Sequence, residues 1–316
     1  MELRKIGSSD IQVAPWAFGG NVFGWTVDEQ MSFRLLDAFV DAGLNLVDTA
    51  DTYSRWKPGN KGGESETIIG KWMKQGGKRD KVIISTKVGS DMGDGKKGVS
   101  KKYILQAAED SLKRLQTDHI DLYWTHFDDV ATPVEETLEA YAQLVKEGKV
   151  RVIGTSNMSP ERIQESLNVS KEKGYPAYQA LQPLYNLYDR EGYETKYEQI
   201  ALDNNLGVFP YYALASGFLT GKYRSEADFA KSPRGQGASK YLNARGYNIL
   251  KELDDVAAKH STTPAAIAIA WLVAQPGITA PIASATKPAQ MEDLAKGAQL
   301  KLQEEDVKKL DEASKY

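Results

Sequence analysis

Four side chains able to hold, move or orient a proton follow buried, β-branched segments of this chain. Asp48 and Tyr53 come after one such segment, Lys87 stands near the end of a second, and His126 stands at the end of a third. A lysine that follows Val-Ile-Ile-Ser-Thr is expected to be buried, and an unpaired buried ammonium group is costly. Asp48 is therefore the expected partner of Lys87.

Together these side chains suit acid–base chemistry on a carbonyl group. A tyrosine hydroxyl titrates near 10 and is a poor proton donor at neutral pH. A neighbouring Lys87 ammonium favours the phenolate, so it is expected to lower the pKa of Tyr53 and make it a usable acid. His126 can donate a hydrogen bond to a substrate carbonyl oxygen. The pattern predicts a site that polarises a carbonyl and delivers a proton to it.

Each of these residues also has another interpretation when it is taken alone. Asp48 fits a turn or a helix cap, and Tyr53 fits a packing residue with its hydroxyl in water. His126 fits a core histidine, and Lys87 fits the Schiff-base lysine of a barrel aldolase. Their occurrence together, each after a successive strand-like segment, favours the acid–base site.

The surrounding chain predicts the elements that would position them. Nearly continuous apolar runs, typical of parallel strands buried on both faces, cover residues 44–50, 81–88, 119–127, 150–156, 177–182, 207–212 and 278–283. Amphipathic stretches typical of helices cover residues 28–42, 64–75, 100–115, 133–146, 160–172 and 242–260. A further strand near Ala17 brings the expected strands to eight.

Eight strand–helix units predict an α/β fold, a (β/α)8 TIM barrel. The 316 residues divide into eight units of about 40, and no linker or change of composition marks a boundary, so residues 1–316 are expected to form a single domain. The opening residues predict an N-terminal β-hairpin that turns at residues 8–10 and covers the barrel floor. The longer polar segments 89–99 and 217–241 are expected at the catalytic face, where barrel enzymes bind substrates.

Five motifs resemble those of the aldo-keto reductases, and the resemblance extends over essentially the whole chain. The motifs are DTADTY (48–53), the lysine of STK (85–87), the histidine of WTH (124–126), GTSN (154–157) and LASGFLTGKY (214–223). The LTGKY loop is similar to that of bacterial members related to potassium-channel β subunits. The resemblance implies an oxidoreductase that reduces aldehyde or ketone carbonyls reversibly to alcohols with NAD(P)H. It also implies Asp48, Tyr53, Lys87 and His126 as the catalytic tetrad, with Tyr53 as proton donor.

The same matching implies a set of cofactor contacts. Ser156, Asn157 and Gln179 match the residues that hold the nicotinamide carboxamide, and Tyr211 matches the aromatic residue on which the ring stacks. The segment that crosses the pyrophosphate matches Leu214, Gly217, Leu219, Thr220 and Lys222, with Arg234 as a further phosphate contact.

The adenosine end departs from the family pattern. Ser284 stands where a glycine or lysine is usual, Gln290 where many members have an arginine, and Leu294 where an asparagine is typical. Ser284, Thr286 and Lys287 at the start of a helix can still hold a 2′-phosphate, and with Gln290 they are the expected cofactor contacts at this end. We therefore expect a modest preference for NADPH, with NADH also possible.

Four aromatic residues fall just after, or at the ends of, the expected strands: Trp25, Trp56, Trp124 and Phe127. They fit either core and loop packing or an apolar, substrate-binding wall that excludes water. GDGKKG at 93–98 matches the pattern G-x-G-x-x-G, but Asp121 begins its strand instead of ending it, so a lysine-rich surface loop is expected there.

Composition excludes several functions. Forty basic against 43 acidic residues give a net charge of −3, which predicts no attraction to nucleic acid or anionic membranes. With no cysteine and three histidines without metal-ligand spacing, no metal site is expected. The longest apolar run, 264–274, is too short for a membrane span, and the first residues lack a signal sequence, so a cytoplasmic location is expected. The expected partners are a small-molecule carbonyl or alcohol and, in a homo-oligomer, further copies of the chain; a monomer is equally compatible.

A second function stays open. A related branch of the family uses this fold as a cofactor-binding regulatory subunit, which predicts slow turnover and a protein partner. The sequence has no N-terminal inactivating extension, and this weighs against that function.

Overall fold

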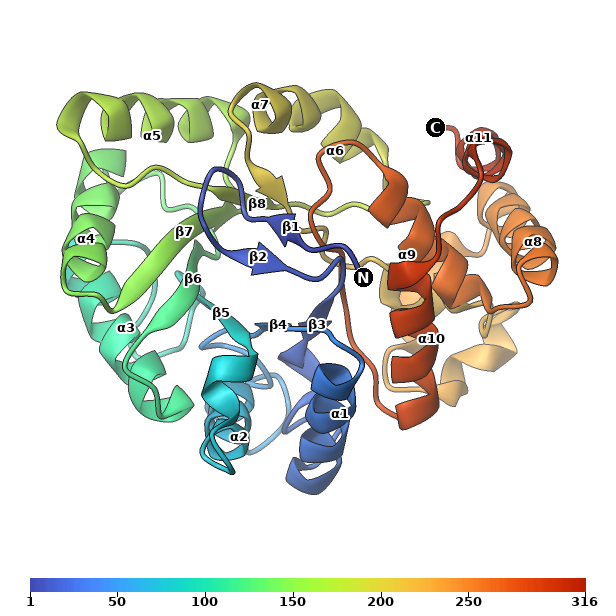
Figure 1. The fold of residues 1–316 in the computed structure, drawn as a ribbon, viewed down its shortest axis with the longest axis horizontal. Coiled ribbons are helices and arrows are strands. Elements are labelled where there is room, and N and C mark those ends of the chain that lie inside the picture. The colour runs from blue at the N-terminus through green and yellow to red at the C-terminus, as the bar shows by residue number, and fades with distance from the viewer.

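An eight-stranded parallel sheet forms the centre of the computed structural model, which describes residues 1–316 (Figure 1). The strands are β3 (Ala17–Gly19), β4 (Leu46–Asp48), β5 (Ile83–Val88), β6 (Ile120–Thr125), β7 (Val150–Ser156), β8 (Ala180–Gln182), β9 (Gly207–Val208) and β10 (Ile282–Ala283). Their order in the sheet is β10-β3-β4-β5-β6-β7-β8-β9. A parallel bridge between Val208 and Ile278 joins the two ends of this order. The predicted (β/α)8 barrel is confirmed.

Helices surround the sheet on its outer side (Figure 1). They are α1 (Glu29–Asp41), α2 (Glu64–Met73), α3 (Lys101–Leu115), α4 (Val134–Lys146), α5 (Pro160–Lys173), α6 (Glu191–Lys196), α7 (Glu198–Asp203), α8 (Ala244–Lys259), α9 (Pro264–Ala274), α10 (Pro288–Gln299) and α11 (Glu304–Ala313). The helix boundaries follow the caps that the sequence offers. Asp28 and Ser100, for example, accept hydrogen bonds from the backbone amides of Met31 and Tyr103 at the starts of α1 and α3. None of the helices combines the length and hydropathy needed to span a membrane.

Several strands are shorter than their apolar runs. The run 278–283 contributes β10 over two residues, and the run 207–212 contributes β9 over two. Residues beside these strands, such as Ile278 and Phe209, are buried without belonging to a regular strand. An apolar run indicates which residues are buried. Burial extends beyond the last residue that forms a hydrogen bond with the neighbouring strand, so the run is longer than the strand.

The N-terminal hairpin covers one end of the barrel, as predicted. β1 (Arg4–Lys5) pairs with β2 (Gln12–Val13) in an antiparallel ladder. Ile6 and Ile11 are buried in the same apolar cluster as Leu46 and Leu122 of the barrel interior. The hairpin therefore closes the end at which the barrel strands begin.

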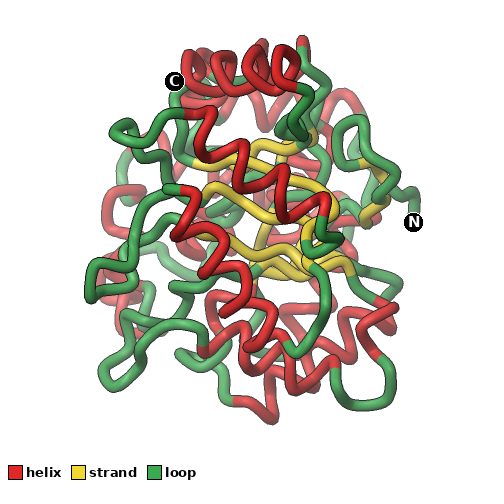
Figure 2. The backbone as a smooth tube through the Cα atoms, turned by 90° about the vertical axis from the view of Figure 1, so that its left-hand side faces the viewer, coloured by secondary structure: helices red, strands yellow, loops and turns green.

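The long loops lie at the opposite end from the hairpin (Figure 2). Residues 89–99 form a loop without a helix or strand, in agreement with the expected surface loop at 93–98. The segment 217–241 contains short 3-10 helices, η3 (Ala215–Thr220), η4 (Glu226–Lys231) and η5 (Gly235–Tyr241). Both segments follow strands at their carboxyl ends, which is the catalytic face of a barrel.

Candidate active site

A buried ion pair lies at the carboxyl ends of β4 and β5. The ammonium nitrogen of Lys87 donates to Asp48 Oδ2 at 2.6 Å, to the Thr49 carbonyl oxygen at 2.6 Å and to the Tyr53 hydroxyl at 2.9 Å. Lys87 is 0% exposed and Asp48 is 1% exposed. Three acceptors match the three protons of the ammonium group, so Lys87 is fully satisfied and links Asp48 to Tyr53.

The register of the barrel strands explains why the side chains of Asp48, Lys87 and Tyr53 lie close together. Asp48 is the last residue of β4 and pairs with Ser85 of β5, so Lys87 lies two residues further toward the carboxyl edge, on the same side of the sheet. Tyr53 is carried by the turn that follows β4. That turn is fixed by Ser54, which has a left-handed φ of 72° and donates from Oγ to the Phe23 carbonyl oxygen at 2.6 Å.

The second oxygen of Asp48 is held by a chain of donors from inside the barrel. Ser85 Oγ donates to Asp48 Oδ1 at 2.7 Å, and Trp124 Nε1 donates to Ser85 Oγ at 2.6 Å. Trp124 is 0% exposed and its ring packs edge-on against Phe209 in the barrel interior. The structure therefore does not place Trp124 in a substrate-binding wall. Trp124 stands two residues before His126 in the chain. Its side chain points into the barrel, but it lies one layer deeper than the side chain of His126.

Burial dominates the acidity of Tyr53. Burial and the Asp48 carboxylate raise the pKa of Tyr53 well above 10.0, and Arg234 acts in the opposite direction. The predicted lowering of this pKa is thus not what the structure shows, because the loss of water around a phenolate outweighs the nearby cations. Tyr53 therefore keeps its proton at neutral pH.

His126 lies beside Tyr53 and is neutral. The two rings are 6.1 Å apart in an edge-on arrangement. Burial, followed by the charge of Lys87, lowers the pKa of His126 well below 6.5. Its Nδ1 lies 2.9 Å from Ser90 Oγ. If the Ser90 hydroxyl donates to Nδ1, the ring proton is on Nε2 and is available to a ligand. Ser90 was not predicted from sequence, since nothing distinguishes it there from other loop serines.

Polar groups from β7 and the segment after β9 gather next to His126. Asn157 Nδ2 donates to the His126 carbonyl oxygen at 2.8 Å and to Ser156 Oγ at 3.1 Å. The Tyr211 hydroxyl donates to Asn157 Oδ1 at 3.2 Å. The structure therefore brings Ser156, Asn157 and Tyr211 together, as the family resemblance implies.

Gln179 lies at the wrong end of its strand to join this group. It precedes β8, and its Oε1 accepts from the Ser8 backbone amide at 2.9 Å on the barrel floor. Gln182, the last residue of β8, is 2% exposed and donates from Nε2 to Asp48 Oδ1 at 3.4 Å. Gln182 therefore occupies the position expected of Gln179. The signal that identifies it is its place at the carboxyl end of the strand.

A cavity of about 480 Å³ opens beside these amides. Asn157, Gln182 and Tyr211 line one side of it, and Arg245 and the C-terminal residue Tyr316 line another. The cavity thus extends from the gathered amide groups to the end of the chain.

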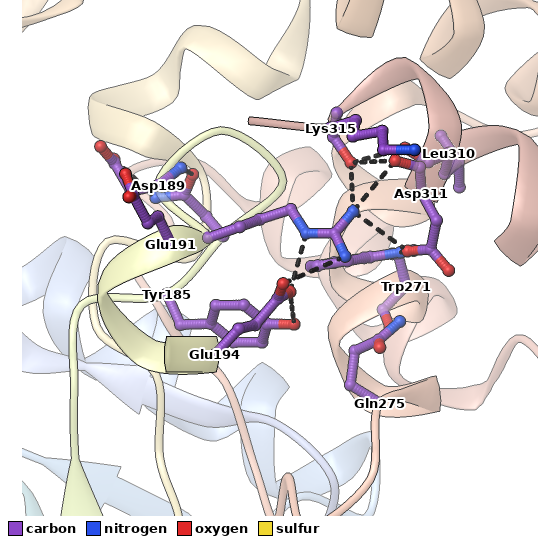
Figure 3. A network of polar contacts seen from close by, with 12 residues as sticks. Tyr185, Asp189, Glu191, Glu194, Trp271, Gln275, Leu310, Asp311 and Lys315 are labelled. Carbon is purple, nitrogen blue, oxygen red and sulfur yellow. Dashed lines mark hydrogen bonds and ion pairs between the residues drawn. The ribbon is translucent and has the colours of Figure 1, made fainter. Parts of the chain in front are cut away.

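One wall of this cavity is held by the polar network that Figure 3 shows. Arg190 Nε pairs with Glu194 Oε1 of α6 at 2.7 Å, and its Nη1 donates to Ser314 Oγ at 2.8 Å. Trp271 Nε1 of α9 donates to Asp311 Oδ1 of α11 at 2.9 Å. The loop after β8 is therefore fixed to the C-terminal helix.

Arg234 is a largely buried cation without a carboxylate partner. It forms no salt bridge, and its guanidinium lies 5.3 Å above the Trp25 ring. With the Asn21 amide nitrogen turned toward Ser284 Oγ, the Asn21 oxygen accepts from Arg234 Nη2 at 2.9 Å. Burial lowers the pKa of Arg234. A guanidinium in this state favours the approach of an anion.

The segment after Tyr211 bends sharply beside this cation. Ala215, Ser216 and Gly217 have successive left-handed φ values of 48°, 57° and 93°. Runs of left-handed residues turn backbone N–H groups to one side, which suits an anion. A Cβ on Gly217 would meet the Lys222 side chain at 3.0 Å, so the lysine lies directly against this bend.

The remaining predicted contacts of this segment differ in exposure. Leu219 is 0% exposed and packs in the core, whereas Leu214 is partly buried. Thr220 Oγ1 donates to the Gly217 carbonyl oxygen at 2.7 Å, which stabilises the bend.

The start of α10 has one free cation. Gln290 Oε1 accepts from the Thr286 backbone amide at 2.9 Å and from Thr286 Oγ1 at 3.0 Å. Lys287 is the N-cap residue, is exposed, and forms no side-chain hydrogen bond or salt bridge. Gln290 therefore occupies the Thr286 groups that were expected to be available to a phosphate.

Three of the four predicted aromatic residues, Trp25, Trp56 and Phe127, pack around Tyr53 and His126. Trp25 and Trp56 are edge-on at 5.6 Å, and Tyr53 and Trp56 are edge-on at 6.1 Å. Phe127 packs on His126 at 4.8 Å between ring centroids. Trp56 is 48% exposed and Phe127 is 47% exposed, so both leave apolar surface open beside Tyr53 and His126. No group of three or more His, Asp or Glu side chains is arranged to hold a metal ion.

Comparison with known proteins agrees with this geometry. The model of the family described as "Aldo/keto reductase family" matches residues 15–315. The chain is 36% identical over 309 residues to "Aldo-keto reductase YhdN" of Bacillus subtilis, covering 96% of this chain and 89% of that protein. It is 32% identical over 299 residues to "Probable voltage-gated potassium channel subunit beta" of Oryza sativa, covering 92% of this chain and 89% of that protein. The chain therefore belongs to the aldo/keto reductase family of oxidoreductases.

Proposed function

We propose that this protein reduces aldehyde or ketone carbonyls to alcohols with NAD(P)H, and catalyses the reverse reaction, with Tyr53 as the proton donor. The observation that supports this most strongly is the set of contacts of Lys87, which touches both Asp48 and the Tyr53 hydroxyl inside a buried site. The neutral His126 beside them supplies a hydrogen-bond donor without a competing positive charge.

Each residue of the site has a separate role in the proposed reaction. His126 Nε2–H orients and polarises the substrate carbonyl oxygen. As negative charge grows on that oxygen, the Tyr53 hydroxyl donates its proton, because an alkoxide is a far stronger base than a phenolate. The Lys87 ammonium stabilises the phenolate that forms, and Asp48 keeps that ammonium charged and oriented. Trp25, Trp56 and Phe127 exclude water from the reacting groups.

The groups around Tyr211 and Arg234 fit a nicotinamide dinucleotide. Ser156, Asn157 and Gln182 offer the amide and hydroxyl groups that a carboxamide requires, next to a tyrosine ring. The unpaired guanidinium of Arg234 and the left-handed bend ending at Gly217 suit the phosphates. When bound and reduced, the dinucleotide supplies a hydride to the carbonyl carbon.

A panel of aldehydes, ketones and alcohols tests the proposal, with the absorbance of the reduced cofactor as the readout. We expect consumption of NADPH with at least one carbonyl class and its formation with the matching alcohol. A protein that binds NADPH but oxidises it with none of the carbonyls would contradict the proposed activity.

Gln182 is expected to contribute to cofactor binding, and Gln179 provides a matched control. Gln182→Ala removes an amide beside Asn157, so the Kd of NADPH should rise by about tenfold, the effect of one hydrogen bond. Gln179→Ala, on the barrel floor, should leave this Kd unchanged. Fluorescence titration measures both. Equal effects of the two substitutions would remove Gln182 from the cofactor site.

We further propose a modest preference for NADPH over NADH, carried by Lys287 at the start of α10. One charge-assisted hydrogen bond contributes about 1.5–3 kcal/mol, or roughly 10–150-fold in affinity. Lys287→Ala should therefore weaken binding of NADPH and barely change that of NADH. Gln290→Arg adds a cation and frees Thr286, so it should widen the preference. Equal kcat/KM for both cofactors in the unmodified protein would show that this end does not recognise the phosphate.

A regulatory role is the second candidate, because two similar plant proteins are named as potassium-channel β subunits. It predicts one rapid turnover of bound cofactor followed by slow release, whereas an enzyme is expected to turn over at about 1–10³ s⁻¹. Stopped-flow measurement of cofactor oxidation separates the two. The cytoplasmic location, the single domain and the monomeric or homo-oligomeric state stay predictions from the sequence.

A further inference from the structure

Asp51 is a second buried carboxyl group at the proposed active centre, and the mechanism above does not use it. It stands between Asp48 and Tyr53 in the chain and is 2% exposed. Neither of its carboxyl oxygens has a hydrogen-bond partner. Its backbone amide donates to the Lys87 carbonyl oxygen at 3.4 Å, so Asp51 is held against the strand that carries the ammonium group.

The ionisable groups around Asp51 come from four elements. Glu66 of α2 is buried and accepts from Arg114 Nε of α3 at 2.6 Å. Tyr103 of α3, Tyr123 of β6 and Lys87 of β5 also interact electrostatically with Asp51. Of these, Tyr123 has no partner for its hydroxyl.

The charges of this cluster cancel without Asp51. Lys87 is neutralised by Asp48, and Arg114 is neutralised by Glu66. An ionised Asp51 would be a buried anion with neither a cation of its own nor a side-chain hydrogen-bond donor, and of the nearby donors the Thr52 backbone amide alone favours it, so ionisation is strongly unfavourable. The neutral acid avoids that cost. In agreement, burial and then the Glu66 carboxylate raise the pKa of Asp51 to about 8, although Arg114, the Thr52 backbone amide and Lys87 act in the opposite direction.

We propose that Asp51 is a positioning residue that must stay protonated for efficient carbonyl reduction, and that its ionisation slows the reaction through Lys87 and Tyr53. This inference rests on the proposed function for its kinetic consequence, but not for the protonation itself.

The position of the negative charge on ionised Asp51 determines whether the rate of reduction rises or falls with pH. A negative Asp51 next to Lys87 offsets part of the positive field that stabilises the Tyr53 phenolate. The pKa of Tyr53 then rises, so Tyr53 donates its proton less readily. The same charge disfavours the negative oxygen that forms on the substrate. Reduction should therefore fall as pH rises through about 8.

Asp51→Asn tests this directly, since the amide has the shape of the neutral acid and cannot ionise. We expect kcat for reduction by the unmodified protein to fall about three- to tenfold between pH 7 and pH 9, as for a shift of up to one unit in the pKa of Tyr53. The variant should keep its pH 7 rate at pH 9. Asp118→Asn, at an exposed position, is the control and should follow the unmodified protein. A variant that loses activity with the same midpoint would overturn the proposal.

Thermal unfolding tests the protonation without any activity. Asp51 titrates near 3.9 when unfolded and at about 8 when folded, so the folded state binds the extra proton and stability falls as pH rises between these values. An asparagine at this position does not titrate, so it cannot contribute to this loss of stability as pH rises. The difference in Tm, Asp51→Asn minus unmodified protein, should therefore increase steadily from pH 5 to pH 8.

The two tests separate the possible failures. A difference in Tm that stays constant from pH 5 to pH 8 would show that Asp51 is already ionised and would overturn the inference. An unmodified protein that reduces no carbonyl, together with a rising difference in Tm, would instead overturn the proposed function and leave the protonation of Asp51 established.

Discussion

Replacing Tyr53 with phenylalanine is expected to lower kcat for carbonyl reduction by about 10²–10⁴-fold, the usual contribution of a general acid. The substitution removes the hydroxyl and its contact with Lys87, 2.9 Å away. It keeps the ring that packs against Trp56 and His126. Cofactor binding should change little, because no predicted cofactor contact is lost.

Two measurements on this variant separate chemistry from folding. Steady-state kinetics with a simple aldehyde gives kcat, and fluorescence titration gives the Kd of NADPH. A large loss of kcat with an unchanged Kd and circular dichroism spectrum is the expected combination. If Tyr53→Phe retains near-normal kcat, another residue is the proton donor and the proposed site is wrong.

Lys87→Met is expected to reduce both activity and stability. It leaves Asp48 as a buried charge without its cation, and breaking a buried ion pair in this way typically costs about 3–5 kcal/mol of folding free energy. It also removes the ammonium that stabilises the Tyr53 phenolate, so the pKa of Tyr53 rises further. Reduction at neutral pH should slow, and alcohol oxidation, which needs the phenolate as base, should require a higher pH.

The double variant Lys87→Met/Asp48→Asn serves as the matched control for the loss of stability. It removes both charges, so it should recover part of the lost folding free energy in urea unfolding without recovering activity. An oxidation pH–rate profile of Lys87→Met that coincides with that of the unmodified protein would remove Lys87 from the mechanism.

The sequence predicted the barrel and the meeting of the tetrad because both depend on strand ends. Apolar runs locate buried strands, and in a parallel barrel all strands end at one face. Asp48, Lys87 and His126 each stand at or beside the carboxyl end of such a run, so their proximity could be inferred without knowing any side-chain conformation.

The features that the sequence did not predict depend on how deep a side chain lies in the barrel and on which end of its strand it occupies. Gln179 and Gln182 lie only three residues apart, but they stand at opposite ends of β8. The side chains of Trp124 and His126 point to the same side of the sheet. Trp124 is 0% exposed in the barrel interior, whereas His126 lies beside Tyr53. The acidity of Tyr53 depends on how much water surrounds it, which no motif reports.

Transfer of deuterium to an aldehyde from NADPH that carries deuterium at both C4 positions of the nicotinamide tests the central claim most directly. We predict that the alcohol product of the unmodified protein carries one deuterium on the carbinol carbon, detected by mass spectrometry and NMR. Under the same conditions Tyr53→Phe should form about 10²–10⁴-fold less labelled alcohol. If the bound NADPH transfers no label to any aldehyde or ketone, the protein is not a carbonyl reductase.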